Sequence, residues 1–251
     1  MNLRFFLQTM CVIFLSLPFI ASSKALDGGS TPNLTLDQVV EKYLEQIGDI
    51  KKVQTRKVQM RMIGLAPFEI KTSVEAKRSN RMRQEVDIQG TIQISAYDGQ
   101  DAWKVDPFLP SGKRAFDMPK ADLTAFVEES YFDGLLVTAK ELKFPMRLLG
   151  VEKVGDKTAY AIQIEAKTGT TTIFLDTTSF LEIKRLQHRM VMGKSTELEV
   201  IVSDYRKQDG LQMPFKFEIG GKESKQKMQV LVEQITLNVP IDNNRFQRPA
   251  S

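Results

Sequence analysis

The stretch AYAIQIEAKTGTTTIFLDTTSFLEIKRLQHRMVMGKSTELEVIVSDY, residues 159–205, decides the fold of this chain. Apolar and β-branched residues alternate with polar ones in four runs, and turn residues near 167–169, 177–179 and 193–194 separate the runs. This alternation is typical of antiparallel strands that bury one face and leave the other in water. The stretch therefore predicts a four-stranded meander, whose inward face carries Tyr160, Ile162, Ile173, Met190 and Val200.

A second alternating region precedes this meander, between residues 53 and 105. Asp98-Gly99 is a strong hairpin signal within it, and the period of two predicts about five strands. The opposite face mixes acids with bases, which favours a solvated surface over a membrane-docking patch. We expect the apolar face to be formed by Val58, Met60, Met62, Ile70, Val74, Ile92, Ile94 and Trp103.

Two helices are predicted beside the strands. Thr35 and Gln38 have the spacing of a capping box, a stripe of apolar residues follows at helical spacing, and Gly48 ends the helix. A shorter helix is predicted after Asp117, which we expect to be its N-cap. Residues 135–149 are ambiguous, with a strand as one reading of 143–149. The total is ten or eleven strands and two helices, a mainly β (α+β) chain.

The first 25 residues predict a secretory signal peptide. Arg4 precedes a short apolar run, and Ser23 and Ala25 fit a small-residue cleavage site. An uncleaved membrane anchor is the alternative, but the run is shorter than the ~20 residues of a spanning helix and contains Pro18. We therefore expect a flexible lead-in over 26–34, one domain over 35–241 and a polar tail over 242–251.

Charge and cysteine content restrict the function. Removing residues 1–25 takes away Arg4 and Lys24 and leaves 33 basic and 31 acidic residues, so nucleic acid is not expected as a partner. Cys11, the only cysteine, lies inside the apolar run of the signal peptide, where lipidation is not expected. The mature chain is then left without a thiol nucleophile or a thiolate metal ligand.

No catalytic constellation is found in the sequence. His188 is the only histidine, and the chain has no Gly-x-Ser-x-Gly elbow, no zinc spacing and no phosphate-binding glycine motif. The neighbouring Asp98, Asp101 and Asp106 are explained by turns, where aspartate bonds its own backbone. We expect neither an enzyme nor a cofactor or metal.

A long antiparallel sheet with one apolar face can close on itself or wrap a helix, and an apolar cavity then remains wherever the helices fill it incompletely. Several motifs along the chain point to a family. YDGQDAWKVDPF (97–108), LLGVEKVGDKTAYAIQIEAKTGTTTIFLDTTSFLEIKRLQ (148–187) and SDYRKQDGLQMPFKFEI (203–219) occur in that order after an amphipathic helix. In this arrangement the chain resembles the bacterial outer-membrane lipoprotein-sorting proteins (LolA/LolB-like), over almost the whole mature length.

The resemblance implies an incomplete β-barrel around helices that act as a lid, and a periplasmic carrier that holds acyl chains of lipoproteins or lipids and helps deliver them to the outer membrane. It suggests an inner-membrane transporter or an outer-membrane receptor as protein partner, with the carrier itself a monomer. The alternative is a non-carrier sensor or an accessory protein of an envelope complex.

The resemblance also implies residue roles. In shuttle members an arginine ties the lid to the barrel, and Arg56 is one option here. The lid helix would carry Leu123, Phe126, Val127 and Tyr131. The cavity would be lined by Val58, Met60, Met62, Ile70, Val74, Ile92, Ile94, Trp103, Phe126, Ile162, Ile173, Met190 and Val200.

Overall fold

The computed structural model describes residues 34–64, 66–110, 112–191, 194–222, 224 and 226–249. The expected signal peptide lies outside these residues. Within them, none of the helices has the length and apolar character needed to cross a membrane. The helices are α2 (Leu36–Ile47), α3 (Lys120–Glu129) and α4 (Leu135–Leu142), with short 3-10 turns η1 (Ile50–Lys52) and η2 (Asn243–Arg245). The strands are β1 (Thr55–Ile63), β2 (Ile70–Lys77), β3 (Arg81–Ile88), β4 (Thr91–Tyr97), β5 (Ala102–Val105), β6 (Phe116–Asp117), β7 (Met146–Val154), β8 (Lys157–Ala166), β9 (Gly169–Asp176), β10 (Glu182–Val191), β11 (Lys194–Gln208), β12 (Leu211–Gly221) and β13 (Met228–Leu237).

The strands belong to one sheet with the order β6-β5-β4-β3-β2-β1-β13-β12-β11-β10-β9-β8-β7. The registers resolved between neighbouring strands are antiparallel. Among the described strands β6 and β7 each have a single neighbour, so the sheet is open. The predicted single antiparallel sheet, an incomplete β-barrel accompanied by helices, is confirmed, with thirteen strands instead of ten or eleven. The chain divides into two compact units, with residues 50–135 and 226–249 in unit 1 and residues 34–49 and 136–224 in unit 2.

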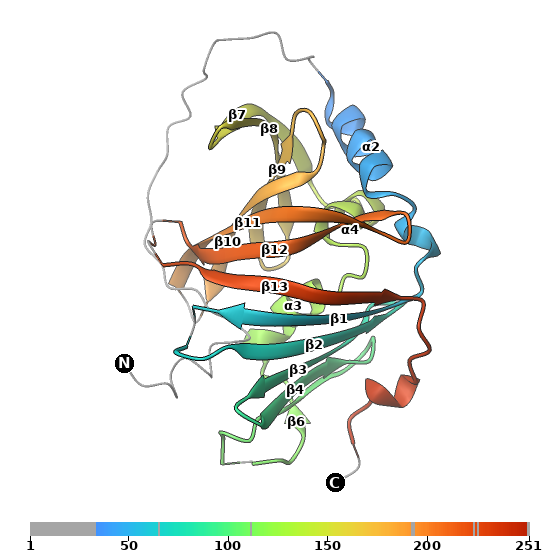
Figure 1. The fold of residues 1–251 in the computed structure, drawn as a ribbon, viewed down its shortest axis with the longest axis vertical. Coiled ribbons are helices and arrows are strands. Elements are labelled where there is room, and N and C mark those ends of the chain that lie inside the picture. Colours follow the sequence, from blue (N-terminus) through green and yellow to red (C-terminus); the bar gives the residue numbers. More distant parts are fainter. Residues whose placement is uncertain are drawn as a thin grey trace. The chain divides into compact units, whose positions relative to one another are not determined.

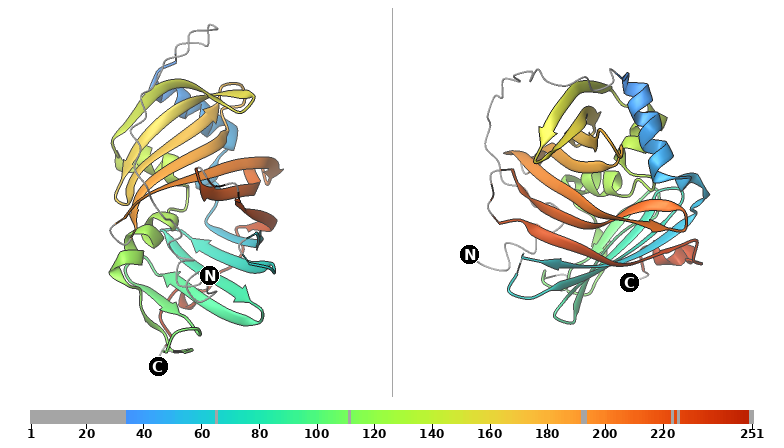
Figure 2. Two further views of the ribbon diagram at one scale, coloured as in Figure 1. Left: turned by 90° about the vertical axis from the view of Figure 1, so that its left-hand side faces the viewer. Right: turned by 45° about the horizontal axis from the view of Figure 1, so that its top comes forward.

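Unit 1 contains β1 to β6, α3, β13 and η2, and its strands twist strongly (Figures 1 and 2). Residues directly opposite each other in an antiparallel pair point to the same side of the sheet. The pairs Val58–Val74 and Met62–Ile70 therefore share one face of β1 and β2. Helix α3 covers the continuation of that face on β3 and β5, because Phe126 packs with Met82 of β3 and Ala102 of β5, and Val74 of β2 packs against this cluster. We call this surface of β1 to β5 the α3 face.

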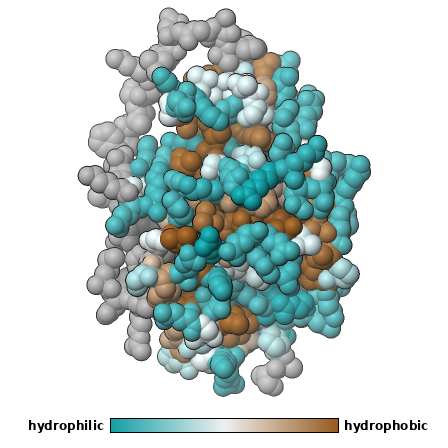
Figure 3. Space-filling view, in the orientation of Figure 1, coloured by the Kyte–Doolittle hydropathy of each residue, from teal (hydrophilic) through white to brown (hydrophobic). Residues whose placement is uncertain are grey.

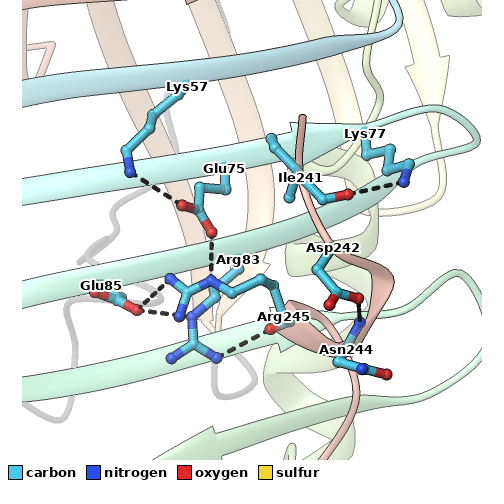
Figure 4. A network of polar contacts seen from close by, with 9 residues as sticks. All are labelled: Lys57, Glu75, Lys77, Arg83, Glu85, Ile241, Asp242, Asn244 and Arg245. Atoms are coloured by element: carbon cyan, nitrogen blue, oxygen red, sulfur yellow. Dashed lines mark hydrogen bonds and ion pairs between the residues drawn. The ribbon is translucent and has the colours of Figure 1, made fainter. Parts of the chain in front are cut away.

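The chain after β13 crosses the opposite, outer face of unit 1 (Figure 4). The Lys77 ammonium donates to the Ile241 carbonyl, and the Arg245 guanidinium donates to Glu75 and Glu85. Phe246 has no exposed surface, and its carbonyl accepts a hydrogen bond from the Trp103 indole at 2.8 Å. The segment expected to be a polar tail thus carries a buried anchor that sequence reasoning missed.

Unit 2 contains α2, α4 and β7 to β12. The predicted capping box of α2 is present, since the Thr35 hydroxyl accepts from the Gln38 N–H and the Gln38 side chain accepts from the Thr35 N–H. Gly48 ends this helix at a φ of 86°, and a Cβ there would lie 2.8 Å from the Gly210 carbonyl oxygen, which explains the glycine. The predicted meander is confirmed as β8 to β11.

One local prediction is wrong, and one ambiguous segment is resolved into a helix and a strand. Asp117 does not cap α3, because it lies in β6 and its carboxylate pairs with Arg248; the residue before the helix is Pro119, which has no capping side chain. Residues 135–142 form the helix α4, in which Leu136, Val137 and Ala139 are buried, and the following strand begins at Met146 rather than at residue 143.

Candidate functional site

The α3 face has an apolar part on β1 and β2. Five residues predicted to line a cavity lie there together: Val58, Met60, Met62, Ile70 and Val74. Val58, Met60 and Val74 are half-buried, whereas Met62 and Ile70 are buried. Apolar side chains that remain reachable beside a covering helix are a typical surface for an apolar ligand.

Helix α3 supplies the covering side chains. Phe126 is buried against Met82, Ala102 and Met118, and Leu123 packs against this cluster. Val127 and Tyr131 are half-buried. The four residues predicted for a lid helix therefore lie on or directly after α3, and two of them contact the sheet of unit 1.

Three predicted wall residues lie on the wrong face. Ile94 is opposite Val105 and Trp103 is opposite Ala96, and these four form a cluster separate from the one under α3. Ile92, two residues before Ile94, lies on the same outer face and is 46% exposed. The apolar pattern of β4 and β5 faces outward because the chain after β13 covers part of that surface. A pocket of about 410 Å³ opens between them, lined by Trp103, Ile94, Val105 and residues of the covering segment.

The predicted residues of unit 2 lie in a packed core. Ile162 of β8 is opposite Ile173 of β9, and Arg185 of β10 is opposite both Ile173 and Val200 of β11. Ile162, Ile173 and Val200 therefore share one face of the sheet. All three are buried. The side chain of Met190 lies outside the residues that the structure describes.

The part of the α3 face on β4 and β5 carries polar side chains as well as Ala102 of the apolar cluster. The Gln93 amide donates to the Asp106 carboxylate at 2.8 Å, and both are buried. The buried Lys104 ammonium lies 3.5 Å from the Asp122 carboxylate of α3. The α3 face is therefore largely apolar on β1 and β2 and mixed on β4 and β5.

Thr72 interrupts the apolar part. It is 3% exposed, and its hydroxyl is one of the buried polar side-chain atoms without a hydrogen-bond partner among the described residues. Burying a hydroxyl unpaired costs roughly 1–3 kcal/mol. A valine would fill the same volume without that cost.

An ion-pair clasp ends the lid segment. Asp133, just after α3, accepts two hydrogen bonds from the Arg78 guanidinium at 2.7 and 2.9 Å and one from the Lys51 ammonium at 2.7 Å. Arg78 also donates to the carbonyls of Val53 and Ile50. We call Arg78, Lys51 and Asp133 the clasp.

Phe132 lies beside the clasp. Arg78 and Arg56 both lie over the Phe132 ring, at 4.7 and 5.1 Å from its centre. Burial alone would raise the pKa of Asp133, but hydrogen bonds from Arg78 and Lys51, with their charges, hold it below its ordinary value. The sequence suggested Arg56 as the arginine that joins the lid to the barrel. In the structure the ion pair with Asp133 is made by Arg78 instead. Asp133-Gly134 had signalled only a helix end.

No catalytic arrangement accompanies these features in the described part of the chain. His188 is half exposed on β10, with its Nε2 3.6 Å from the Glu197 carboxylate, which also pairs with Lys222. No group of three or more histidine, cysteine, aspartate or glutamate side chains there has the arrangement of a metal site.

An open antiparallel sheet with a helix over an apolar face defines the class of incomplete β-barrels. Solved structures place the chain more narrowly. It is similar to a LolA superfamily protein from Nitrosomonas europaea, with 14% identity, a TM-score of 0.59, and coverage of 85% of this chain and 98% of that one. A putative outer membrane lipoprotein-sorting protein domain from Vibrio parahaemolyticus shows 11% identity, a TM-score of 0.57 and coverage of 84% and 95%.

A DUF1329 family protein from Desulfovibrio piger is also similar, with 12% identity, a TM-score of 0.57 and coverage of 85% and 97%. No family model matches the sequence, and no curated protein matches it. The chain therefore has a LolA-like fold, as the motifs had indicated.

Proposed function

We propose that this chain is a periplasmic carrier that holds acyl chains of lipoproteins or lipids on the α3 face and helps deliver them to the outer membrane. The observation that carries the proposal is the half-buried apolar surface of Val58, Met60 and Val74 beside α3, in a chain with a LolA-like fold. Each buried methylene of an acyl chain would contribute about 0.8 kcal/mol. Binding of that kind is reversible without a covalent step.

The proposal includes a location and partners. Cleavage of residues 1–25 would release the mature chain into the periplasm, where it would act as a monomer. An inner-membrane transporter would load it or an outer-membrane receptor would accept its cargo. The proposed role is one of binding, and it requires no covalent step by the protein.

Gentle purification followed by lipid mass spectrometry tests the proposal. We expect co-purified acyl lipid, and saturable binding of a fluorescent fatty-acyl probe after delipidation. An empty protein that takes up no probe would refute the carrier role. A fixed protein partner that co-purifies without lipid would favour the alternative of a sensor or accessory protein.

A matched pair of variants locates the binding surface. Met60→Gln places an amide on the α3 face, and Ile92→Gln places the same amide on the outer face of the same unit. We expect five- to tenfold weaker probe binding for Met60→Gln, which corresponds to about 1–1.4 kcal/mol, and unchanged binding for Ile92→Gln. Met60 is chosen over Phe126 because Phe126 is buried in the cluster under α3, so a polar residue there would disturb folding. Equal effects of the two variants would remove the α3 face as the binding surface.

A further inference from the structure

Thr72 is a buried polar residue in an apolar setting. Its partner on β1 is Met60 and its partner on β3 is Val86. Along β2 its neighbours on the same face are Ile70 and Val74. All four are apolar, and no acceptor or donor for the Thr72 hydroxyl is found among the described residues.

The neighbours also decide how a ligand atom could reach this hydroxyl. Val86 and Ile70 are buried, whereas Met60 and Val74 are half-buried. Met60 is unbranched and can change its rotamer at low cost. A ligand that lies on the apolar part of the α3 face would therefore meet Thr72 once Met60 moves aside.

We propose that Thr72 hydrogen-bonds the carbonyl oxygen of an acyl ester or amide, and so makes this face selective for acylated ligands over simple alkyl chains. The inference rests on the proposed function, because it assumes that an acyl chain occupies the α3 face. Hydrocarbon contacts cannot distinguish an acyl from an alkyl chain of equal length. A hydroxyl that lacks a protein partner can distinguish the two chains, because it donates a stronger hydrogen bond to a carbonyl oxygen than to an ether oxygen. The polar side chains on β4 and β5 lie on the same face but are already paired, which leaves Thr72 as the hydroxyl to bond the ligand.

Two lipids that differ in one group test the inference. Monopalmitoylglycerol carries an ester carbonyl, and 1-O-hexadecylglycerol replaces it with an ether of the same length and the same head. We expect the wild-type chain to bind the ester about tenfold more tightly, as measured by displacement of a fluorescent fatty-acyl probe. Thr72→Val should lower ester affinity to the level of the ether and leave ether affinity unchanged, while Thr72→Ser should retain the preference.

Thr55→Val is the matched control for folding. The Thr55 hydroxyl, on the adjacent strand β1, donates to the Val239 carbonyl. This variant should lower the urea midpoint and keep the ester preference, whereas Thr72→Val should leave the midpoint unchanged or raise it. A lowered midpoint for Thr72→Val would mean that the hydroxyl already has a partner, such as water, and would count against the inference.

The outcomes separate the two proposals. If neither lipid binds the wild-type chain, the carrier function fails and the inference fails with it. If both lipids bind equally well, or if Thr72→Val weakens both by the same factor, the carrier function stands and the role of Thr72 is refuted.

Discussion

Asp133→Asn tests how much the clasp contributes to unit 1. The side chain of Asp133 is 5% exposed and accepts from both terminal nitrogens of Arg78 and from Lys51. Asparagine has nearly the same shape but keeps one acceptor oxygen and turns an amide donor toward the guanidinium. The substitution therefore removes the charge and leaves the packing of the neighbouring Phe132 in place.

The expected loss of stability is about 3 kcal/mol. A hydrogen bond to a charged group contributes about 1.5–3 kcal/mol, and removing one partner of a buried pair costs about 3–5 kcal/mol. The Lys51 side chain is 51% exposed, so its share is small. We therefore expect a loss in unfolding free energy of about 3 kcal/mol rather than about 5 kcal/mol.

The stabilising effect should depend on pH. The pKa of Asp133 is lowered in the folded chain, so the unfolded chain binds its proton first as the pH falls, near pH 3.9. The stabilisation is complete above that value and is lost as the pH falls through the lower, folded pKa. The difference between the wild type and Asp133→Asn should thus be constant above about pH 5 and shrink below about pH 4.

Urea unfolding followed by tryptophan fluorescence measures the effect. Trp103 is the only tryptophan and lies in unit 1 with the clasp, so its emission reports that unit. With an m-value of about 1–3 kcal/mol/M, the midpoint should fall by roughly 1–3 M. Glu69→Gln, which breaks an exposed ion pair to Arg61 in the same unit, is the control, with an expected loss below about 1 kcal/mol. Equal shifts in the two variants, or a difference that does not change with pH, would refute the reasoning.

Three further substitutions test other parts of the structure. Phe246→Ala should destabilise unit 1 by about 3–5 kcal/mol, because the ring is fully buried. It should also shift the Trp103 emission to longer wavelength. An unchanged unfolding free energy would mean that Phe246 does not anchor the segment after β13. Ile162→Asp should abolish the folded signal of unit 2 in circular dichroism, since it buries an unpaired charge; a normal thermal transition would contradict the assigned inward face. His188→Ala should change the unfolding free energy by less than about 0.5 kcal/mol, and a hydrolase activity that this variant abolished would contradict the proposed binding role.

The sequence predicted helices and strands correctly where neighbouring residues determine the structure and the buried face agrees with the local pattern. Thr35 and Gln38 predicted the start of α2 because a capping box involves only neighbouring residues. The alternation in β8 to β11 predicted the strands because one face of each is buried. In β10, Arg185 lies on the same face as Ile173 and Val200 and pairs with Glu182 of the same strand, so the inward face includes a charge that the pattern did not suggest.

The sequence was insufficient where a distant segment decides which face is buried. Ile94 and Trp103 alternate correctly for strands, but period two does not tell inside from outside when both faces are covered. The cover of the outer face comes from Phe246, 143 residues after Trp103 in the chain. Arg78 and Asp133 are likewise 55 residues apart, so no local pattern signals the clasp.

The hydrophilic outer surface was easier to anticipate. Strand β1 contributes bases to this surface, and β2 with the preceding Glu69 contributes acids, so that Arg61 pairs with Glu69 and Lys57 with Glu75. Hydrophilic residues cover much of the face seen in Figure 3, with hydrophobic ones between them. This agrees with a solvated face.

The composition of unit 1 has a consequence for the order of folding. Strand β1 pairs with β13, and residues as far apart as Arg56 and Leu237 are direct partners. Closing so long a loop is entropically costly and slows folding. Unit 1 cannot acquire its complete set of strands, or the Phe246 anchor, until residues 226–249 have been synthesised. Until those residues are available, strand β1 would expose an unpaired edge, which makes an incomplete unit 1 prone to pairing with other chains.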